Sequence, residues 1–275
     1  MLSWLGAPFG SEVVVRGAVA GSVVALMCAI VGTWVVLRGS VFLGDAMSHG
    51  MLPGVAAASA LGGNLLIGAL IAALAMAYGV AALSRTARFS SDTSIGLLLV
   101  GMLAIGVIVV SHSSSYAVDL TAFLFGDVLG VRARDIAVLV GALVLIAVVA
   151  FVGRRAFLAA TFDVRKAATL RLNPRLAAVA LTVLIAVAIV ASFHVVGTLL
   201  VLGLLVAPPA AATLWAHSIG RIMVLAAAIG VVSVWVGLLV SWHAGTAGGA
   251  SIAAVAVGLF FCSAMASGVF GRATA

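Results

Sequence analysis

An aspartate and a histidine lie four residues apart in a stretch that is otherwise mostly apolar, FLGDAMSHGMLPG at residues 42–54. On a helix, Asp45 and His49 share a face, so a carboxylate oxygen and an imidazole nitrogen can converge on one point. This pair of donors suits Zn, Mn or Fe in the divalent state. Because two side chains cannot complete a coordination shell, a site here needs water, a backbone carbonyl or a second copy of the chain.

The composition places this stretch in a membrane. Of the 275 residues, 65% are hydrophobic and 8% are charged, whereas soluble domains have roughly 25% charged residues. The apolar runs approach or exceed the roughly 20 residues that a spanning helix needs and lack the alternation of barrel strands. The net charge of +7 comes from basic residues in short gaps between these runs, a pattern that sets membrane orientation and does not indicate nucleic acid. We therefore predict an all-α polytopic membrane protein.

At membrane depth the pair needs an explanation. An ionisable group there costs about 2.5 to 3.5 kcal/mol on insertion scales. Pro53 lies four residues after His49 and has no N–H, so it frees the carbonyl of residue 49 or kinks the helix. One interpretation is a metal pathway. The alternative is that Asp45 and His49 only pair with each other or cap a helix near the interface.

Nine spans are predicted, forming one permease domain over residues 1–275. They are placed at 14–37, 42–60, 63–84, 93–111, 133–153, 175–193, 195–215, 222–242 and 250–270. With an outside N-terminus and an inside C-terminus, eleven of the fourteen basic residues face the cytoplasm, as the positive-inside rule requires. No basic residue precedes the first span, so we expect that span to be retained and not cleaved as a signal peptide.

Other candidate residues lie at span ends or inside spans. His243 stands in SWHAGTAGGAS, a glycine-rich outer turn where an ion could enter, and is a weak metal candidate. His112, His194 and His217 are expected to be structural, since an amphipathic ring is comfortable at a span end. Pro208 and Pro209 remove two hydrogen bonds from an apolar run, which predicts a gate or a packed kink.

Two connections exceed simple turns. The outer one, 112–132, contains a short apolar helix candidate, and the inner one, 154–174, carries most of the basic charge and includes a short helix starting near Asp163. The sequence has no G-x-x-x-x-G-K-[ST] motif, so it cannot cradle nucleotide phosphates as a P-loop does. Any ATP hydrolysis belongs to another chain.

Five ordered motifs resemble the membrane permease subunit of the zinc/manganese ABC importers. They are VVLRGSVFLGDAMSHGMLPG (35–54), SSDTSIG (90–96), DLTAFLFGDVL (119–129), VVGTLLVLGLLVAPPAAA (195–212) and GLLVSWHAGTAGGA (237–250). The resemblance implies a homodimer in the bacterial cytoplasmic membrane, two cytoplasmic ATP-binding subunits and an extracytoplasmic metal-binding protein. It also implies that Asp45 and His49 of both copies line the pathway, with no permanently bound cofactor.

By the same resemblance, FDVRKAATLRL in the inner connection is similar to the coupling helix that docks on the ATPase. The residues concerned are Asp163, Arg165, Lys166 and Ala167. Departures from the family pattern occur here and elsewhere: Arg165 replaces a common acid, Arg171 a common glycine, Pro209 is extra, and Gly245 stands where Asp or Asn is frequent.

Two other functions compete with the ABC permease. A secondary metal transporter driven by an ion gradient would need its own coupling site, which is hard to build from seven acids placed mostly at span ends. A polytopic membrane enzyme would need a second convergent catalytic group. The sequence alone does not rank Mn, Zn and Fe(II), since selectivity depends on geometry and availability.

Overall fold

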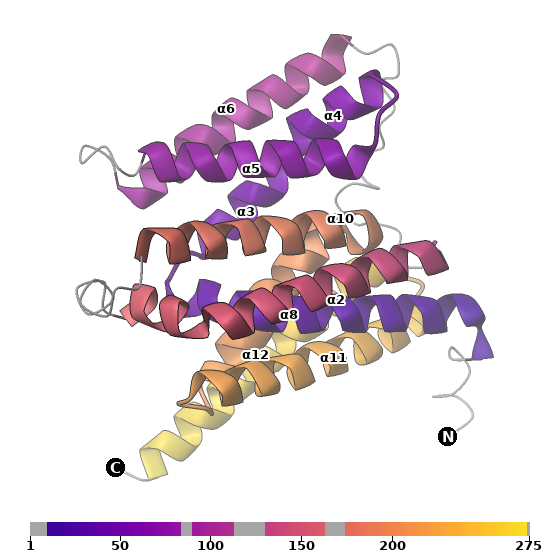
Figure 1. Cartoon of the computed structure of the whole chain (residues 1–275). Coiled ribbons are helices and arrows are strands. Elements are labelled where there is room, and N and C mark those ends of the chain that lie inside the picture. The colour runs from indigo at the N-terminus through magenta and orange to yellow at the C-terminus, as the bar shows by residue number, and fades with distance from the viewer. Residues whose placement is uncertain (1–9, 84–89, 113–129, 163–173, 274–275) are drawn as a thin grey trace. The chain divides into compact units, whose positions relative to one another are not determined.

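The structure, a computed structural model, describes residues 10–83, 90–112, 130–162 and 174–273. Apart from one turn of 3₁₀ helix at residue 10, the regular structure in these ranges is α-helix, which confirms the all-α prediction (Figure 1). The helices are α2 (Glu12–Leu37), α3 (Val41–Gly50), α4 (Leu52–Ala60), α5 (Leu65–Leu83), α6 (Ser91–His112), α8 (Ala133–Phe162), α10 (Pro174–Thr213), α11 (Ile219–Ala244) and α12 (Gly248–Ala273).

Eight stretches of the described helices are long and apolar enough to cross a membrane, two of them within α10. They match eight of the nine predicted spans. The remaining one, 42–60, is divided into α3 and α4, which are 10 and 9 residues long. Neither helix reaches the length of a bilayer by itself. The chain is a multi-pass membrane protein.

The inner connection begins later than the sequence suggested. Helix α8 has 30 residues and continues to Phe162, so residues 154–162 are helical and do not belong to a loop. At about 45 Å this helix is longer than the roughly 30 Å hydrocarbon core. Residues 163–173, with Asp163, Arg165, Lys166 and Ala167, lie outside the described residues, as do residues 113–129 of the outer connection.

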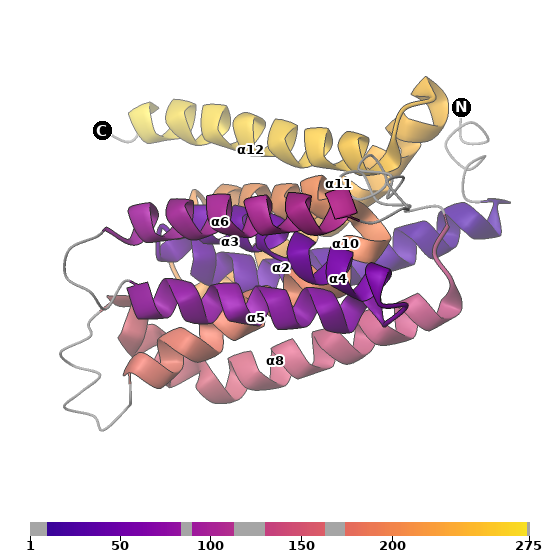
Figure 2. The same ribbon diagram turned by 90° about the horizontal axis from the view of Figure 1, so that it is seen from above.

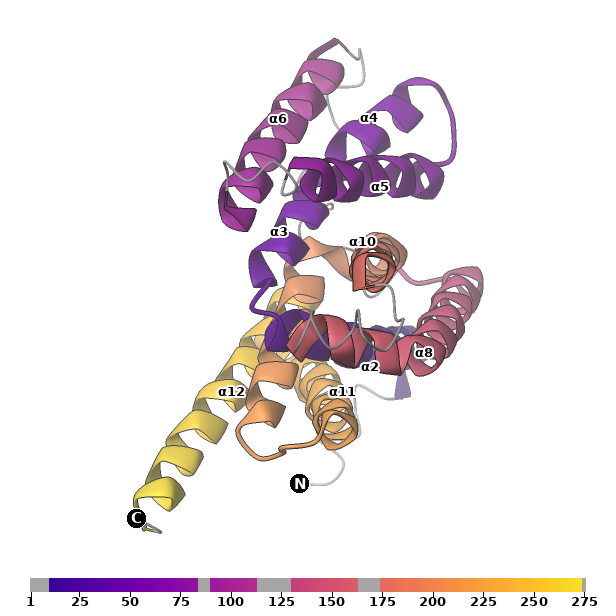
Figure 3. The same cartoon turned by 60° about the vertical axis from the view of Figure 1, so that its left-hand side comes forward.

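The contacts divide the chain into two compact units. Unit 1 comprises Met1–Leu37, Thr121–Val148 and Ser192–Ala275, and unit 2 comprises Arg38–Leu120 and Val149–Ala191. In unit 1, α11 packs against both α2 and α12, as the views in Figures 1 and 3 agree. In unit 2, α3 and α4 pack against α5 and α6, which the view from above also shows (Figure 2). A single permease domain over 1–275 stays a prediction.

Small residues set the close helix contacts of unit 1. A side chain at Gly21 would meet Val234, one at Gly230 would meet Ala25, and one at Gly237 would meet the backbone of Ile252. Lipid-embedded helices associate through such close packing, because lipid tails are as apolar as the helix surfaces and provide no hydrophobic driving force.

Helix α10 is broken at a glycine and not at its prolines. Gly197 has φ 74° and ψ 163°, a conformation that residues with a Cβ rarely adopt, and it separates two helical segments. The second segment continues through Pro208 and Pro209. A role for these prolines as a gate stays a prediction.

The carbonyl that Pro209 leaves without an intrahelical donor belongs to Leu205. Helix α2 approaches this carbonyl at Gly32, where an added Cβ would collide with the Leu205 oxygen and come within 3.0 Å of Pro209 Cγ. Nearby, the Cys28 thiol lies 3.9 Å from the Val201 carbonyl oxygen. Glycine at position 32 therefore allows α2 to cover the part of α10 that proline weakens.

We expect Gly32→Ala to lower the free energy of unfolding by about 1–3 kcal/mol, because the new methyl group meets backbone that cannot rotate away. Gly141→Ala is the matched control, since nothing lies within 4 Å of a Cβ at this helical position. Thermal unfolding of the two variants in detergent checks this. A Gly32→Ala midpoint equal to that of wild type would contradict the packing described here.

Candidate metal site

Helix α3 separates apolar and ionisable side chains onto different faces. Leu43 and Met47 are buried, whereas Asp45 and His49 are partly exposed. The helix follows a turn in which Gly39 has φ 64°. The Ser48 hydroxyl is buried and donates to the Gly44 carbonyl at 3.0 Å, so it is satisfied within the helix. The sequence thus folds locally so that Asp45 and His49 form the polar face of α3.

The segment changes helix directly after His49. Helix α3 ends at Gly50, Met51 connects it to α4, and Pro53 lies in the first turn of α4. Proline fits there, because the first N–H groups of a helix have no intrahelical acceptor. The Met51 N–H donates to the Met47 carbonyl at 3.2 Å, and Pro53 has no N–H to offer the His49 carbonyl, so the structure shows a break between two short helices at this point.

Three glycine contacts hold this break against α5 and α6. A Cβ at Gly50 would collide with the Met76 sulfur of α5, and one at Gly54 would collide with the Gly68 carbonyl of the same helix. On α6, a Cβ at Gly106 would lie 3.3 Å from the Pro53 nitrogen. These close approaches fix α3 and α4 on both sides of Met51, and so they fix the helix that carries Asp45 and His49.

The two candidate ligands face each other without a hydrogen bond. Asp45 Oδ1 lies 3.7 Å from His49 Nε2, beyond hydrogen-bond range. Their side chains are 41% and 30% exposed, respectively, and no other hydrogen bond to either occurs within the described ranges. An ion about 2.1 Å from each atom, an ordinary ligand distance, fits between an oxygen and a nitrogen with this separation.

The donor set in one chain is incomplete. Among residues 10–83, 90–112, 130–162 and 174–273, no three His, Cys, Asp or Glu side chains are grouped to hold a metal ion. A tetrahedral or octahedral ion would need at least two more ligands than Asp45 and His49 supply. The pair can contact a passing ion but cannot enclose one.

His243 lies in a different setting. It is exposed near the C-terminal end of α11 in unit 1, and its Nδ1 lies 2.9 Å from the Leu239 carbonyl. Because a carbonyl only accepts, Nδ1 carries the proton in the neutral ring and the lone pair is on Nε2. Gly245 follows with φ 63° and ψ 31°, a left-handed cap that Asn or Asp also tolerates. Metal binding at His243 stays a prediction.

Sequence reasoning missed the glycines that support the site. Gly54 and Gly68 allow α4 and α5 to touch through their backbones, and Gly197 breaks α10. The signal available was a glycine within an apolar run, but the chain has 31 glycines. Sequence alone does not show which of them meet another backbone.

The ABC 3 transport family matches residues 10–267. The chain belongs to this ABC-3 family.

Individual ABC-3 relatives cover most of the chain. The manganese transport system membrane protein MntC of Listeria monocytogenes is 34% identical over 86% of this chain and 85% of its own length. A probable iron transport system membrane protein of Haemophilus influenzae is 32% identical over 92% and 93%. The structure of PsaBC from Streptococcus pneumoniae in complex with Fab superposes with a TM-score of 0.84, 28% identity and coverage of 96% and 95%.

As an ABC-3 member, the chain is a multi-pass membrane permease of a bacterial ABC importer. The permease has no ATPase activity of its own and works with an ATPase and a binding protein. This assignment takes the place of the ion-gradient transporter and the membrane enzyme that the sequence had left as alternatives.

Proposed function

We propose that this permease imports a divalent first-row transition-metal ion, with Mn(II) as the first candidate, along a path that Asp45 and His49 line. The observation that supports this most is the 3.7 Å approach of Asp45 Oδ1 and His49 Nε2 on an exposed helix face. One carboxylate and one imidazole bind borderline and hard divalent ions and are poor ligands for Cu(I). Relatives named for manganese and for iron transport fit the same class of ion.

The working unit in this proposal is a homodimer. One chain offers two donors, and the described residues offer no third. Two copies related by a two-fold axis would present the same residues to each other, giving two carboxylates and two imidazoles. Four such donors complete a tetrahedral shell, and an octahedral ion would keep two water ligands. Because each copy supplies only two of the donors, the ion can leave when the two copies move apart.

The proposed orientation has the N-terminus outside and the C-terminus inside, which requires an odd number of crossings. Eight described stretches can span alone, and α3 with α4 would provide the ninth. Their 19 residues rise about 28 Å, close to the roughly 30 Å core. The ninth crossing keeps eleven of the fourteen basic residues on the cytoplasmic side.

A C-terminal green fluorescent protein fusion tests the orientation, because this protein becomes fluorescent in the cytoplasm but not after export by the Sec machinery. We expect fluorescence from the C-terminal fusion and alkaline phosphatase activity from an N-terminal one. Termini on the same side, seen as fluorescence without phosphatase activity or as phosphatase activity without fluorescence, would mean that α3 and α4 do not cross.

Two cytoplasmic ATP-binding subunits would dock on the inner connection, with Asp163, Arg165, Lys166 and Ala167 as the proposed coupling segment. Helix α8 leads into this segment and carries Arg154 and Arg155, both exposed, in its C-terminal third. Arg154 lies 5.2 Å from the centre of the Phe151 ring, a cation–π distance. The long helix thus provides a stiff support for the proposed coupling segment. An extracytoplasmic protein would deliver the ion from the other side.

The test is metal uptake into proteoliposomes that contain the permease with its ATPase and binding protein. We expect Asp45→Ala and His49→Ala each to reduce Mn(II) uptake at least a hundredfold, because each removes a ligand type from both copies of the pathway. Parallel uptake of Zn(II) and Fe(II) at equal concentration identifies the preferred ion.

Matched controls separate the pathway from general damage. Glu12→Ala removes an exposed carboxylate that pairs with Arg16, and His217→Ala removes an exposed imidazole between α10 and α11. Both should retain uptake and assembly with the ATPase. Normal uptake by Asp45→Ala and His49→Ala would make the pair structural and overturn the proposal.

A further inference from the structure

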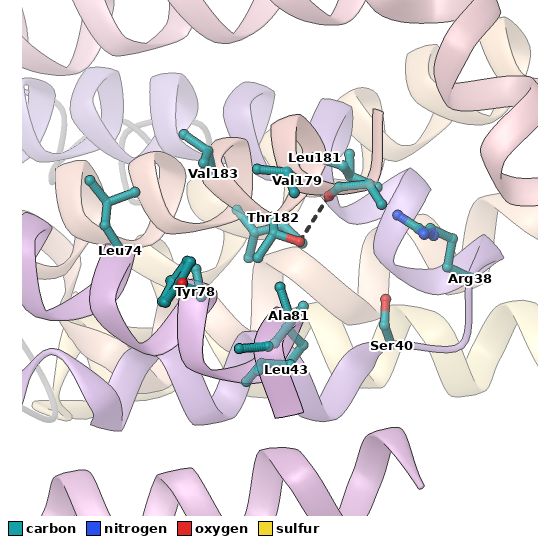
Figure 4. A pocket seen from close by; sticks show the side chains of 15 residues that line it. Arg38, Ser40, Leu43, Leu74, Tyr78, Ala81, Val179, Leu181, Thr182 and Val183 are labelled. Carbon is teal, nitrogen blue, oxygen red and sulfur yellow. Dashed lines mark hydrogen bonds between the residues drawn. The ribbon is translucent and has the colours of Figure 1, made fainter. Parts of the chain in front are cut away.

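Unit 2 contains a cavity of about 650 Å³ between α3, α5 and the first part of α10 (Figure 4). Its walls are mostly apolar, and all of its lining residues belong to unit 2. Leu43, Leu74 and Leu181 are examples from the three helices. The volume lies within the roughly 300–1,000 Å³ of ordinary small-molecule sites, which combine apolar walls with a few polar groups.

One end of the cavity carries a cation. Arg38, in the turn between α2 and α3, is half-buried, and the burial lowers the pKa of its guanidinium, although arginine stays charged in proteins. Within the described part of the chain, the Arg38 side chain has neither an ion pair nor a hydrogen bond. Figure 4 shows its guanidinium and the Ser40 hydroxyl directed into the space between the helices.

An anionic partner would stabilise such a half-buried cation. A charge taken partly out of water loses hydration, which only a counter-charge or several hydrogen bonds can replace. The Thr182 hydroxyl, which also lines the cavity, already donates to the Ala178 carbonyl at 2.9 Å. Among the described residues, the cavity therefore combines a positive charge that has no counter-charge with an apolar wall.

The same cavity is unsuited to the transported metal. Arg38 is the only formal charge among its lining residues, and no carboxylate or imidazole lines it. Helix α3 contributes Leu43 to this cavity, whereas Asp45 and His49 do not line it. A divalent cation would meet repulsion here and no ligand.

We propose that this cavity binds an anionic phospholipid, with the phosphodiester at Arg38 and Ser40 and one acyl chain along the apolar wall. The rim is open, since Tyr78 is 77% and Val179 is 43% exposed, so a lipid chain can enter from the side. In the sequence, Arg85 follows α5, and Arg175 is the second residue of α10. Basic pockets between spanning helices on the cytoplasmic side are typical sites for anionic headgroups.

Only the assignment to the inner leaflet rests on the orientation proposed above. The site itself rests on the geometry of unit 2, and its test does not involve metal. A lipid site that failed would leave Asp45 and His49 unaffected, and a failed metal pathway would leave the lipid site unaffected.

Native mass spectrometry of the full-length chain tests the proposal, with dioleoyl phosphatidylglycerol and dioleoyl phosphatidylcholine titrated separately. We expect the anionic lipid to bind about tenfold more tightly, the effect of one charge-assisted hydrogen bond. Arg38→Gln should remove this preference. Arg155→Gln, the same change at an exposed arginine of α8, should retain it.

A second variant addresses the apolar wall. Ala178→Leu places a larger side chain on α10 inside the cavity and should weaken binding of the anionic lipid severalfold even with Arg38 intact. It also keeps the test decisive should Arg38→Gln fail to fold.

Three results would overturn the lipid site. The first is equal binding of both lipids by wild type. The second is an undiminished anionic preference in Arg38→Gln, or binding of the anionic lipid by Ala178→Leu that is as tight as in wild type. The third is full displacement of the anionic lipid by inorganic phosphate at millimolar concentration, which would show a site for a free anion in which the acyl chain takes no part.

Discussion

The cost of removing polar groups from water constrains this permease more than any other interaction. In a chain that is 65% hydrophobic, each ionisable side chain and each unpaired backbone group must find a partner or a polar cavity. Asp45 and His49 lie 3.7 Å apart on a partly exposed face, and the helix that carries them ends one residue later. A pair held in this way matches the proposed role of contacting the transported ion.

Glycine contacts provide the rigidity that such a pair needs. Gly54 and Gly68 bring α4 and α5 together through their backbones, and Gly32 brings α2 onto the Leu205 carbonyl. In both places a helix is interrupted or weakened by proline, and a neighbouring helix without a Cβ covers it. Irregular backbone is tolerated at membrane depth only when protein or a water-filled cavity surrounds it. In both places, a glycine allows a neighbouring helix to approach closely where proline leaves a backbone carbonyl without its intrahelical donor.

The sequence predicted the spanning helices well, because every segment that crosses the hydrocarbon core must be long and apolar, and hydropathy measures this property. It also singled out Asp45 and His49, since charged groups in an apolar run are rare. It separated the two spans of α10 at residue 194, close to the break at Gly197, but it did not show that the second segment continues as a helix through Pro208 and Pro209. The reason is that proline is accepted within a helix when a neighbour covers the freed carbonyl, and coverage depends on packing that sequence does not contain. The cavity beside Arg38 was missed for the same reason.

The central claim is that His49 binds the transported ion, and pulsed electron paramagnetic resonance measures this directly. Mn(II) bound to the purified permease should show echo modulation from an imidazole nitrogen, and that modulation should be lost in His49→Gln while His217→Gln retains it. Nitrogen modulation that is absent in wild type, or that persists unchanged in His49→Gln, would contradict the account.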